Sequence, residues 1–576
     1  MRRASLFAGL LSLAFVACDG ASAPTPPPGP DPEPPEPEYL SPAEHLVRVS
    51  MTLRGMRPSL EDLAAVAADA QALPGIVDKY LETPEFGATI KDLHNETLWL
   101  RTNQPRFTFR PIAGTAYAEG TFQFVAESLS EEPLRLIEHV VTTNRPYGEI
   151  VTADYTFANG LVASIWGLPH AGDAADWEQV SWANAVEPRP AAGILSSSEF
   201  FFRYRSAGAN YHRGRANAIS RALLCHDYLA SDIVVNTSID LSDPEVVANA
   251  VVANPSCAGC HQTLDPLGSF LPGFRNNLTP GNVTTYPITN VYAPARERQW
   301  RNTTKRPPGY FGAAGEKLDD LGKMIAADPR FARCAAQRFA SYFTEQDLDA
   351  LPVAWVSELT DAFVASNLSA KALAKAVVLS KPFRVSHASA EQSAEAAEGV
   401  LGLQKLRPEQ MDRMIFDLTG FRWQHESTAR AAAMTIGTTN LLQSDLLGFR
   451  VLAGGIDSYF VTVPSHTYNA TSSLVLRRLA TEAATFVVDA DLANPSAAQR
   501  KLLRKVEPTT RDAAAVRAQL SDLHLRLFGT FDAADSEAVA LSYGLFADTL
   551  AATDDVAYAW KTTLAAMLQD LRIAYF

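Results

Sequence analysis

The chain has 576 residues, 47% of them hydrophobic and 20% charged, which is typical of a globular protein long enough for several domains. Its 50 basic and 64 acidic residues give a net charge of −14, an acidic balance that argues against a nucleic-acid-binding protein. Five cysteines in a chain of this length exclude a disulfide-dense scaffold. They stand at positions 18, 225, 257, 260 and 334.

The first segment has the features of an export signal. Arg2 and Arg3 precede an apolar run over 6–16, which is too short to span a bilayer. The run ends FVAC at Cys18 and resembles the lipobox of bacterial lipoproteins, in which the cysteine is acylated and becomes the new N-terminus. We therefore expect a signal peptide over 1–17, a lipidated Cys18 and a place at a membrane of the bacterial cell envelope. Ordinary cleavage after a small residue is the alternative.

A proline-rich segment separates this anchor from the rest of the chain. Residues 24–37 contain nine prolines in fourteen residues, which excludes helix and sheet and favours an extended polyproline conformation. At about 3.1 Å per residue, such a segment would hold the globular part about 40 Å from the membrane. We assign 18–40 as a lipid anchor and tether.

The globular part is predicted to be mainly α and multi-domain. Helical spacing of apolar residues dominates its two ends, whereas the middle is rich in glycine, proline and aromatic residues. Eight prolines between 254 and 313 favour loops there. The expected domains are a helical domain over 41–145, a loop-rich middle domain over 146–386 and a second helical domain over 399–576.

A ten-residue pattern occurs twice. Residues 48–57 and 413–422 share an arginine, a leucine five residues later, a glycine two residues after that and a final arginine. Gly55 and Gly420 are each predicted to end a helix in the left-handed conformation. Duplication and a recurrent helix-stop pattern both explain the repeat.

Residues 257–261 read CAGCH and carry the clearest chemistry. C-x-x-C-H is the attachment motif of c-type haem: two thiols on one helical turn add to the haem vinyls, and the histidine projects to the iron. Cys257, Cys260 and His261 are therefore the predicted site of one covalent haem c. A zinc site, a thioredoxin-like pair or a local disulfide are the alternatives, but no second CxxC is present and the flanks do not suggest a βαβ unit.

The haem segment also resembles a known group of proteins. CAGCHQTLDPLGSFLPGF, from Cys257 onward, resembles the CxxCH-x3-DPLG segment of bacterial multi-domain cytochrome-like proteins that are catalogued as domains of unknown function. Weaker similarity lies at 48–63, 213–225 and 328–334, so the resemblance covers about residues 45–345. It implies haem binding and supplies no substrate.

Further residues are candidates for the surroundings of the iron. The Asp265-Pro266 turn expected after His261 makes the carbonyl of Pro266 a candidate acceptor for the imidazole N–H, with Asp265 as a turn-capping residue. Met324 is the candidate sixth ligand, and a place in a helix–helix core is the alternative. His212 and His226 are weaker candidates.

The two remaining cysteines are predicted to pair. In an oxidising compartment Cys225 and Cys334 favour a disulfide around the haem segment, while two separate buried thiols are the alternative.

The expected function is single-electron transfer to an unidentified redox partner, and the acidic surface favours a basic partner. A haem-dependent oxidoreductase of peroxidase or oxygenase type, or an envelope scaffold with a structural haem, remain open, and the catalytic residues are unknown.

Overall fold

The computed structural model describes residues 37–102, 122–173, 175–206, 210–230, 239–240, 242–275, 285–387, 402–426, 430–431, 434–435, 438–445 and 447–576. The predicted signal peptide, Cys18 and nearly all of the tether lie outside this part of the chain. The same holds for most of the polar stretch between the middle and C-terminal domains.

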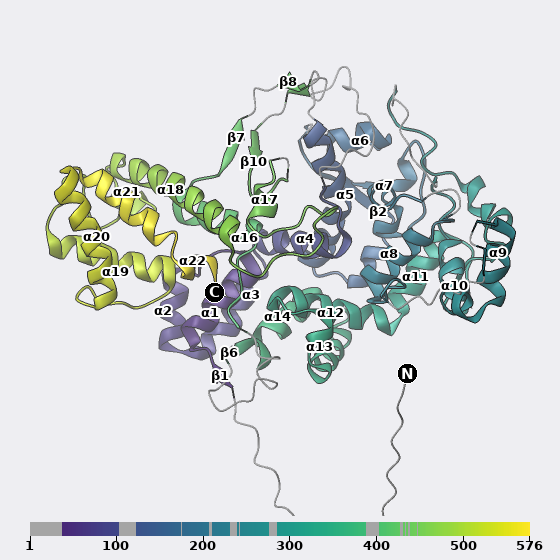
Figure 1. Cartoon of the computed structure of the whole chain (residues 1–576), viewed down its shortest axis with the longest axis horizontal. Coiled ribbons are helices and arrows are strands. Elements are labelled where there is room, and N and C mark those ends of the chain that lie inside the picture. The colour runs from purple at the N-terminus through teal and green to yellow at the C-terminus, as the bar shows by residue number, and fades with distance from the viewer. Residues whose placement is uncertain are drawn as a thin grey trace, which may run out of the picture.

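The described chain is mainly α, as the sequence predicted (Figure 1). Its helices are α1 (Pro42–Arg54), α2 (Leu60–Ala68), α3 (Leu73–Tyr80), α4 (Pro84–Leu98), α5 (Phe122–Thr142), α6 (Gly160–Trp166), α7 (Ser198–Arg203), α8 (Arg213–Leu224), α9 (Pro244–Ala253), α10 (Pro255–Gly268), α11 (Leu318–Ala327), α12 (Pro329–Thr344), α13 (Val353–Ala365), α14 (Ala370–Leu379), α16 (Pro408–Thr419), α17 (Phe449–Leu452), α18 (Ala470–Ala493), α19 (Ala513–Phe528), α20 (Glu537–Thr553), α21 (Val556–Met567) and α22 (Leu571–Ala574).

The strands are short and pair two by two. Each pair among the described residues is an antiparallel ladder: β1 (Glu38–Tyr39) with β6 (Val385–His387), β2 (Tyr155–Ala158) with β3 (Glu178–Ser181), β4 (Gly309–Tyr310) with β5 (Ala313–Ala314), β7 (Gln424–Glu426) with β10 (Thr438–Asn440), and β8 (Arg430–Ala431) with β9 (Met434–Thr435).

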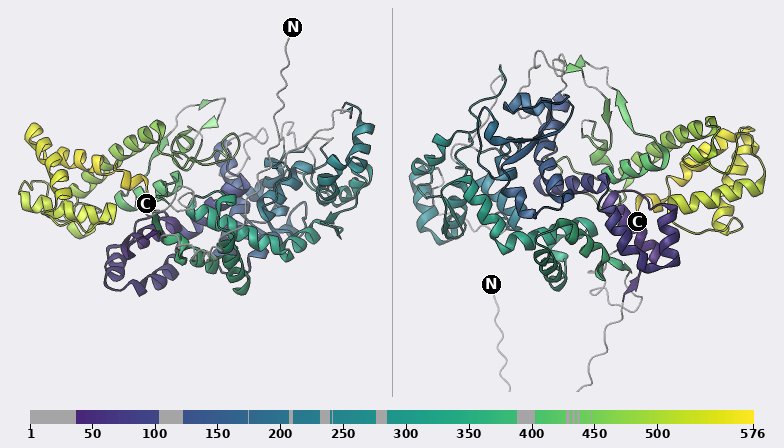
Figure 2. Two further views of the ribbon diagram at one scale, coloured as in Figure 1. Left: turned by 60° about the horizontal axis from the view of Figure 1, so that its bottom comes forward. Right: turned by 180° about the vertical axis from the view of Figure 1, so that it is seen from behind.

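The molecule is elongated. The C-terminal helices α18–α21 lie at one end and α9 with α10 at the other, with α1–α5 and α12–α14 between them (Figures 1 and 2). Buried apolar side chains form one continuous cluster from Leu46 to Phe576, and α5 packs against both α4 and β2. The expected boundary at residue 145 therefore falls within a shared core, and the domain limits stay predictions.

The repeated pattern lies on α1 and α16, which pack against each other. Gly55 (φ +66°) and Gly420 (φ +75°) end these helices in the left-handed conformation, which confirms the predicted caps. A Cβ at Gly55 would lie only 2.9 Å from the Cα of Gln410, so glycine is needed there for the close approach as well. Arg413 Nε donates to the carbonyl of Arg54 (2.9 Å) and so ties the two repeats together.

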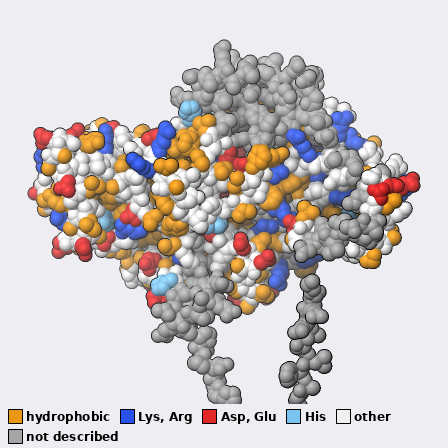
Figure 3. Space-filling view, viewed as in Figure 1, with side chains coloured by type: hydrophobic (Ala, Val, Ile, Leu, Met, Phe, Trp, Pro, Cys, Tyr) orange, Lys and Arg blue, Asp and Glu red, His pale blue; other side chains and the backbone are white. Residues whose placement is uncertain are grey.

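The surface carries both charges. On the face in Figure 3, acidic and basic side chains are interspersed, and acidic ones gather at the end where α9 lies. Asp243 and Glu245, at the start of α9, are exposed. Within the described ranges we find no helix of the length and apolarity that a membrane span requires.

Candidate functional site

The predicted haem segment is a helix. α10 begins at Pro255, where the side chain of Asn254 accepts a hydrogen bond from the amide of Ser256, and it continues to Gly268. Proline is tolerated in a first helical turn because that residue needs no N–H partner, so Pro255 does not oppose the helix. Pro266 lies inside its last turn. The expected break after His261 is therefore absent from α10, which packs against α8, α9 and β4.

The three motif residues share one face of α10. Cys257, Cys260 and His261 stand at spacings of three and four, which places their side chains one above another. All three are partly exposed, and neither thiol forms a disulfide. A Cβ at Gly259, on the opposite side of the helix, would meet nothing within 4 Å, so that side is also open. The arrangement offers two free thiols and an imidazole from a single accessible face.

His261 is held by a buried carboxylate. Its Nδ1 lies 2.9 Å from Oδ1 of Asp265, one helical turn further on, and a carboxylate can only accept, so Nδ1 carries the proton. The side chain of Asp265 is 1% exposed, whereas that of His261 is 23% exposed. Among the described residues, Nε2 of His261 has no hydrogen-bond partner. The ring is thus fixed through one nitrogen while the other remains available.

These contacts correct two predictions. The carbonyl of Pro266 accepts from the amide of Ser269 (3.2 Å), not from His261. Asp265 does not cap a turn, because the helix continues through it and its side chain points back to the imidazole at i−4. In a continuous helix the backbone carbonyls lie along the axis, so a side chain four residues away becomes the natural partner for His261.

Arg213 anchors the carboxylate from a second helix. Its Nε donates to Oδ1 of Asp265 (2.6 Å) and its Nη2 to Oδ2 (2.9 Å), a two-pronged contact from the start of α8 to α10. Burial would raise the pKa of Asp265, but the hydrogen bonds from His261 and Arg213 and the guanidinium charge outweigh it and lower the pKa to about 2. Asp265 is therefore an anion at neutral pH.

Other contacts fix the backbone of α10. Arg306 donates through Nη1 to the carbonyl of His261 (2.9 Å) and through Nη2 to the carbonyl of Val251 on α9 (3.2 Å). The hydroxyl of Tyr228 donates to Oγ1 of Thr263 (2.9 Å). The position of His261 is thus set from three sides: by α8, by the segment around Arg306, and by the chain after α8.

The three candidate sixth ligands differ in how exposed they are and in what they contact. Met324 lies on α11, partly buried against the core, with its methyl group beside Gly315. His212 is 4% exposed and its Nδ1 lies 2.9 Å from Nη1 of Arg215. His226 is exposed, and its ring lies 4.6 Å from that of Tyr228. Ligation of iron by any of them stays a prediction.

Cys225 and Cys334 form a disulfide. The bond joins the residue that ends α8 to α12, across a sequence separation of 109, with the two Cα atoms 5.3 Å apart. α9, α10 and the CAGCH motif lie within the loop that it closes. Of the two possibilities that the sequence left open, the structure contains the bridge.

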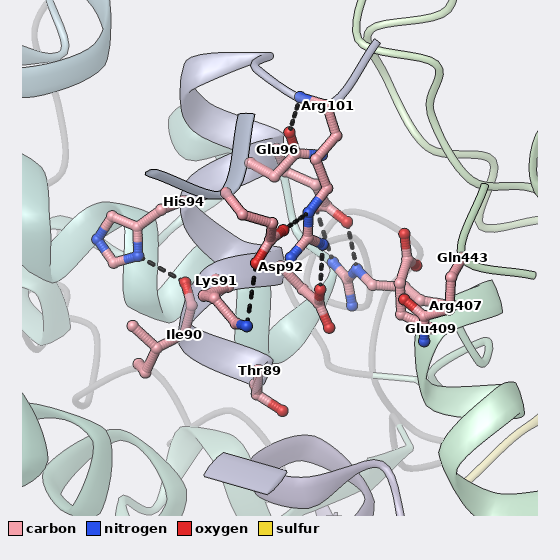
Figure 4. A network of polar contacts seen from close by, with 12 residues as sticks. Thr89, Ile90, Lys91, Asp92, His94, Glu96, Arg101, Arg407, Glu409 and Gln443 are labelled. Carbon is pink, nitrogen blue, oxygen red and sulfur yellow. Dashed lines mark hydrogen bonds and ion pairs between the residues drawn. The ribbon is translucent and has the colours of Figure 1, made fainter. Parts of the chain in front are cut away.

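A second polar region lies between α4, α5 and α16, and the sequence analysis missed it. It is a cavity of about 770 Å³ crossed by ion pairs (Figure 4). Asp92 binds Arg101 (2.6 Å) and Arg413 (2.8 Å), and Arg101 also binds Glu131 (2.7 Å). These charges pair with one another, and Asp92 and Arg413 are 321 positions apart in the chain. The only sequence signal was that Arg413 belongs to the repeated pattern.

Asp445 lines the same cavity, and its pKa is raised whereas that of Asp92 is lowered. Its side chain is 6% exposed and lies 3.5 Å from Arg450. Burial raises its pKa to about 7, against the opposing charge of Arg450 and with the help of Glu409 and Asp457. Its Oδ1 accepts no hydrogen bond from the described residues.

A histidine in the C-terminal helices has two partners. Nδ1 of His524 lies 2.9 Å from Oδ2 of Asp532 and Nε2 lies 2.9 Å from Oγ of Ser542. The order resembles a catalytic triad, but Ser542 lies in the interior of α20, where the backbone amides are bonded within the helix and offer no oxyanion donors. His524 is 1% exposed, so we interpret it as a satisfied core residue.

Comparison with known proteins gives two partial matches. Residues 40–168 match the model of a protein family of unknown function (DUF1592), and residues 312–383 match another of unknown function (DUF1585). Neither match includes the CAGCH motif. No curated protein and no solved structure matches the chain. Among the described residues, no group of three or more His, Cys, Asp and Glu side chains is placed to hold a metal ion.

Proposed function

We propose that this protein carries one covalent haem c on α10 and transfers single electrons at the bacterial cell envelope. The observation that supports this most is the shared, accessible face of Cys257, Cys260 and His261, with the imidazole fixed through Nδ1 and Nε2 left available. When bound, haem supplies one-electron cycling between ferric and ferrous iron. The chain's own residues fix the histidine and set its charge environment.

Apolar side chains on the elements that flank α10 are exposed. α9 packs against α10 and leaves Val252 63% exposed and Val246 38% exposed, while Leu229, which follows α8, is 72% exposed. Exposed apolar side chains are compatible with a surface that another group covers. Arg306 donates to a backbone carbonyl of each helix and so holds α9 and α10 together.

The proposal includes export and anchoring. A signal peptide, lipidation at Cys18 and a proline-rich tether would place the haem at the envelope, where covalent attachment takes place. The membrane is then a partner through the acylated cysteine, and a soluble or membrane-bound redox protein is the second partner.

Exposed charges of both signs stand near α10. Asp243 and Glu245 lie at the start of α9, which packs against α10, and Lys305 precedes Arg306, which contacts both helices. The net charge of the chain favours a basic redox partner, and the charges beside α10 do not single out one sign.

The test is covalent haem on the full chain. The protein, expressed with its signal sequence in a bacterium that makes c-type cytochromes, is separated under denaturing conditions and stained for haem peroxidase activity. The wild type and the neighbouring control Ser256→Ala retain the signal, whereas Cys257→Ser with Cys260→Ser loses it. A wild type without covalent haem, or an unchanged signal in the double variant, overturns the proposal.

The second candidate function is chemistry at the iron, as in a haem-dependent oxidoreductase. The carboxylate behind His261 favours it, because a more strongly donating axial histidine supports reactions at an open sixth position. Absorbance spectra with carbon monoxide and with peroxide separate the two. A six-coordinate spectrum unchanged by either indicates electron transfer, and ready binding indicates an oxidoreductase.

A further inference from the structure

We propose that Asp265 is a positioning residue that would give His261, as a ligand of a bound haem, anionic character and so lower the reduction potential of that haem. The inference rests on the proposed haem attachment and deepens it. It concerns which oxidation state this chain stabilises, and it assigns functions to Asp265 and Arg213 that the motif alone does not reveal.

The first step is the type of acceptor. A metal-bound histidine donates its second N–H to a carbonyl, a water or a carboxylate, and the acceptor sets the basicity of the ring. Here the acceptor is Oδ1 of Asp265 at 2.9 Å, an oxygen of a buried carboxylate that also pairs with the guanidinium of Arg213. Hydrogen bonds to an ionised group are shorter and about twice as strong as those between neutral groups. The N–H of His261 is therefore polarised more than a backbone carbonyl would polarise it.

The second step is burial. Asp265 is 1% exposed, so water does not screen its charge from the imidazole. The carboxylate is also fixed, because its backbone carbonyl accepts from Ser269 and its two oxygens contact Arg213. A fixed buried anion acts on His261 in every molecule, in contrast to a mobile surface carboxylate.

The third step is the balance between Arg213 and His261. Oδ1 of Asp265 receives both Nε of Arg213 (2.6 Å) and Nδ1 of His261 (2.9 Å). The guanidinium keeps the carboxylate ionised and in place, and it also withdraws part of the negative charge from the imidazole. Arg213 therefore moderates the effect that Asp265 produces, and the two residues are expected to shift the potential in opposite directions.

The consequence follows from charge alone. Ferric iron carries one more positive charge than ferrous iron, so a more electron-donating imidazole at His261 would stabilise the ferric form of a bound haem. Loss of the carboxylate charge should make reduction easier, and loss of the guanidinium charge should make it harder.

The experiment is a spectroelectrochemical titration of the full-length haem protein. Asp265→Asn should raise the midpoint by at least the equivalent of a tenfold change in the equilibrium constant of reduction, which is 59 mV for one electron. Asp319→Asn, a carboxylate on α11 paired with Lys323, is the matched control and should leave the midpoint unchanged. Where the ferrous haem is five-coordinate, resonance Raman adds a structural readout, because the iron–histidine stretch should fall in Asp265→Asn.

Two further variants complete the test. Asp265→Glu keeps the charge and should retain most of the low potential, and Arg213→Gln should lower the midpoint further. If Asp265→Asn does not fold, Arg213→Gln alone decides. A protein with covalent haem whose midpoint and iron–histidine stretch do not respond to these variants overturns the inference. A wild type without covalent haem overturns the proposed function instead.

Discussion

Two aspartate–histidine pairs in this protein have the same 2.9 Å spacing and different surroundings. His261 and Asp265 lie on α10, where the histidine side chain is 23% exposed and its second nitrogen is without a partner in the described chain. His524 and Asp532 lie among the C-terminal helices, where the histidine side chain is 2% exposed and Ser542 occupies the second nitrogen. The pair alone therefore does not identify a site. The accessible second nitrogen of His261 is what distinguishes it from His524 and is the reason that it belongs to the proposed site.

The two regions are also held together differently. The part of the chain around α10 is closed by the Cys225–Cys334 bond, whereas the C-terminal helices α18–α21 contain no cysteine and depend on packing. A half-exposed helix that presents reactive groups buries little surface of its own. External anchors such as the disulfide, Arg213 and Arg306 supply the missing stability.

The largest effect is expected from removal of the disulfide. Cys225→Ala with Cys334→Ala should lower the free energy of unfolding of the α8–α12 region by about 3–5 kcal/mol, because a loop of more than a hundred residues is released in the unfolded chain. Native-state hydrogen exchange resolves the regions: amides of α8, α10 and α12 should lose protection and those of α18 and α21 should keep it. An equal loss of amide protection in α8–α12 and in α18 and α21 would contradict the conclusion that the two regions are stabilised differently.

The second-largest effect is a difference in stability between variants of His524 and His261. His524→Ala should destabilise the C-terminal helices by about 2–4 kcal/mol, since it leaves a cavity and removes the partners of Asp532 and Ser542. His261→Ala in the haem-free protein should lower stability by only about 1 kcal/mol, because the ring is partly exposed and the buried Asp265 keeps Arg213 as a partner. Urea unfolding followed by circular dichroism measures both. A reversed order would refute the interpretation of His524 as structural.

A smaller effect concerns a third histidine, His94 on α4. Its Nδ1 lies 2.7 Å from the carbonyl of Ile90 and its Nε2 2.7 Å from the hydroxyl of Tyr147. Burial lowers its pKa to about 4, below the value of 6.5 in the unfolded chain. The stability that this histidine contributes is therefore present above pH 6.5 and lost as the pH falls towards 4, by up to about 3 kcal/mol.

The measurement is the free energy of unfolding between pH 7 and pH 4. His94→Gln should show a shallower loss than the wild type over this range. Part of the slope should remain, because burial lowers the pKa of His45 to about 4 as well. Identical slopes in both proteins would mean that His94 is not buried in its neutral form.

Local signals predicted the local structure. The αL caps at Gly55 and Gly420 and the spacing of the CAGCH motif depend on a few neighbouring residues, and a sequence shows these directly. The helix through Pro266 was missed because a proline near a helix end can be accommodated when neighbouring elements hold the chain. Once the turn was assumed, Asp265 could not be recognised as the partner of His261, since an i,i+4 contact exists only in a helix.

Contacts between residues far apart in the chain could not be predicted from the sequence. Arg213 and Asp265 are 52 positions apart and Asp92 and Arg413 are 321 apart. Ion pairs of this kind depend on how helices pack, and any of the 64 acidic residues could have been the partner of either arginine. The sequence therefore indicated the thiols and the imidazole on α10 but not the residues that contact them from other helices.

The Cys225–Cys334 bond has one more consequence, for the order of thiol chemistry as the chain matures. Four cysteines in the globular part can form two disulfides in three ways, and each pairing that crosses between the two sets would consume a thiol of α10. Once Cys225 and Cys334 are joined, neither can pair with a thiol of α10, and Cys257 and Cys260 are free in this structure. The bridge therefore removes both crossed pairings and leaves Cys257 and Cys260 only each other as disulfide partners within the globular part.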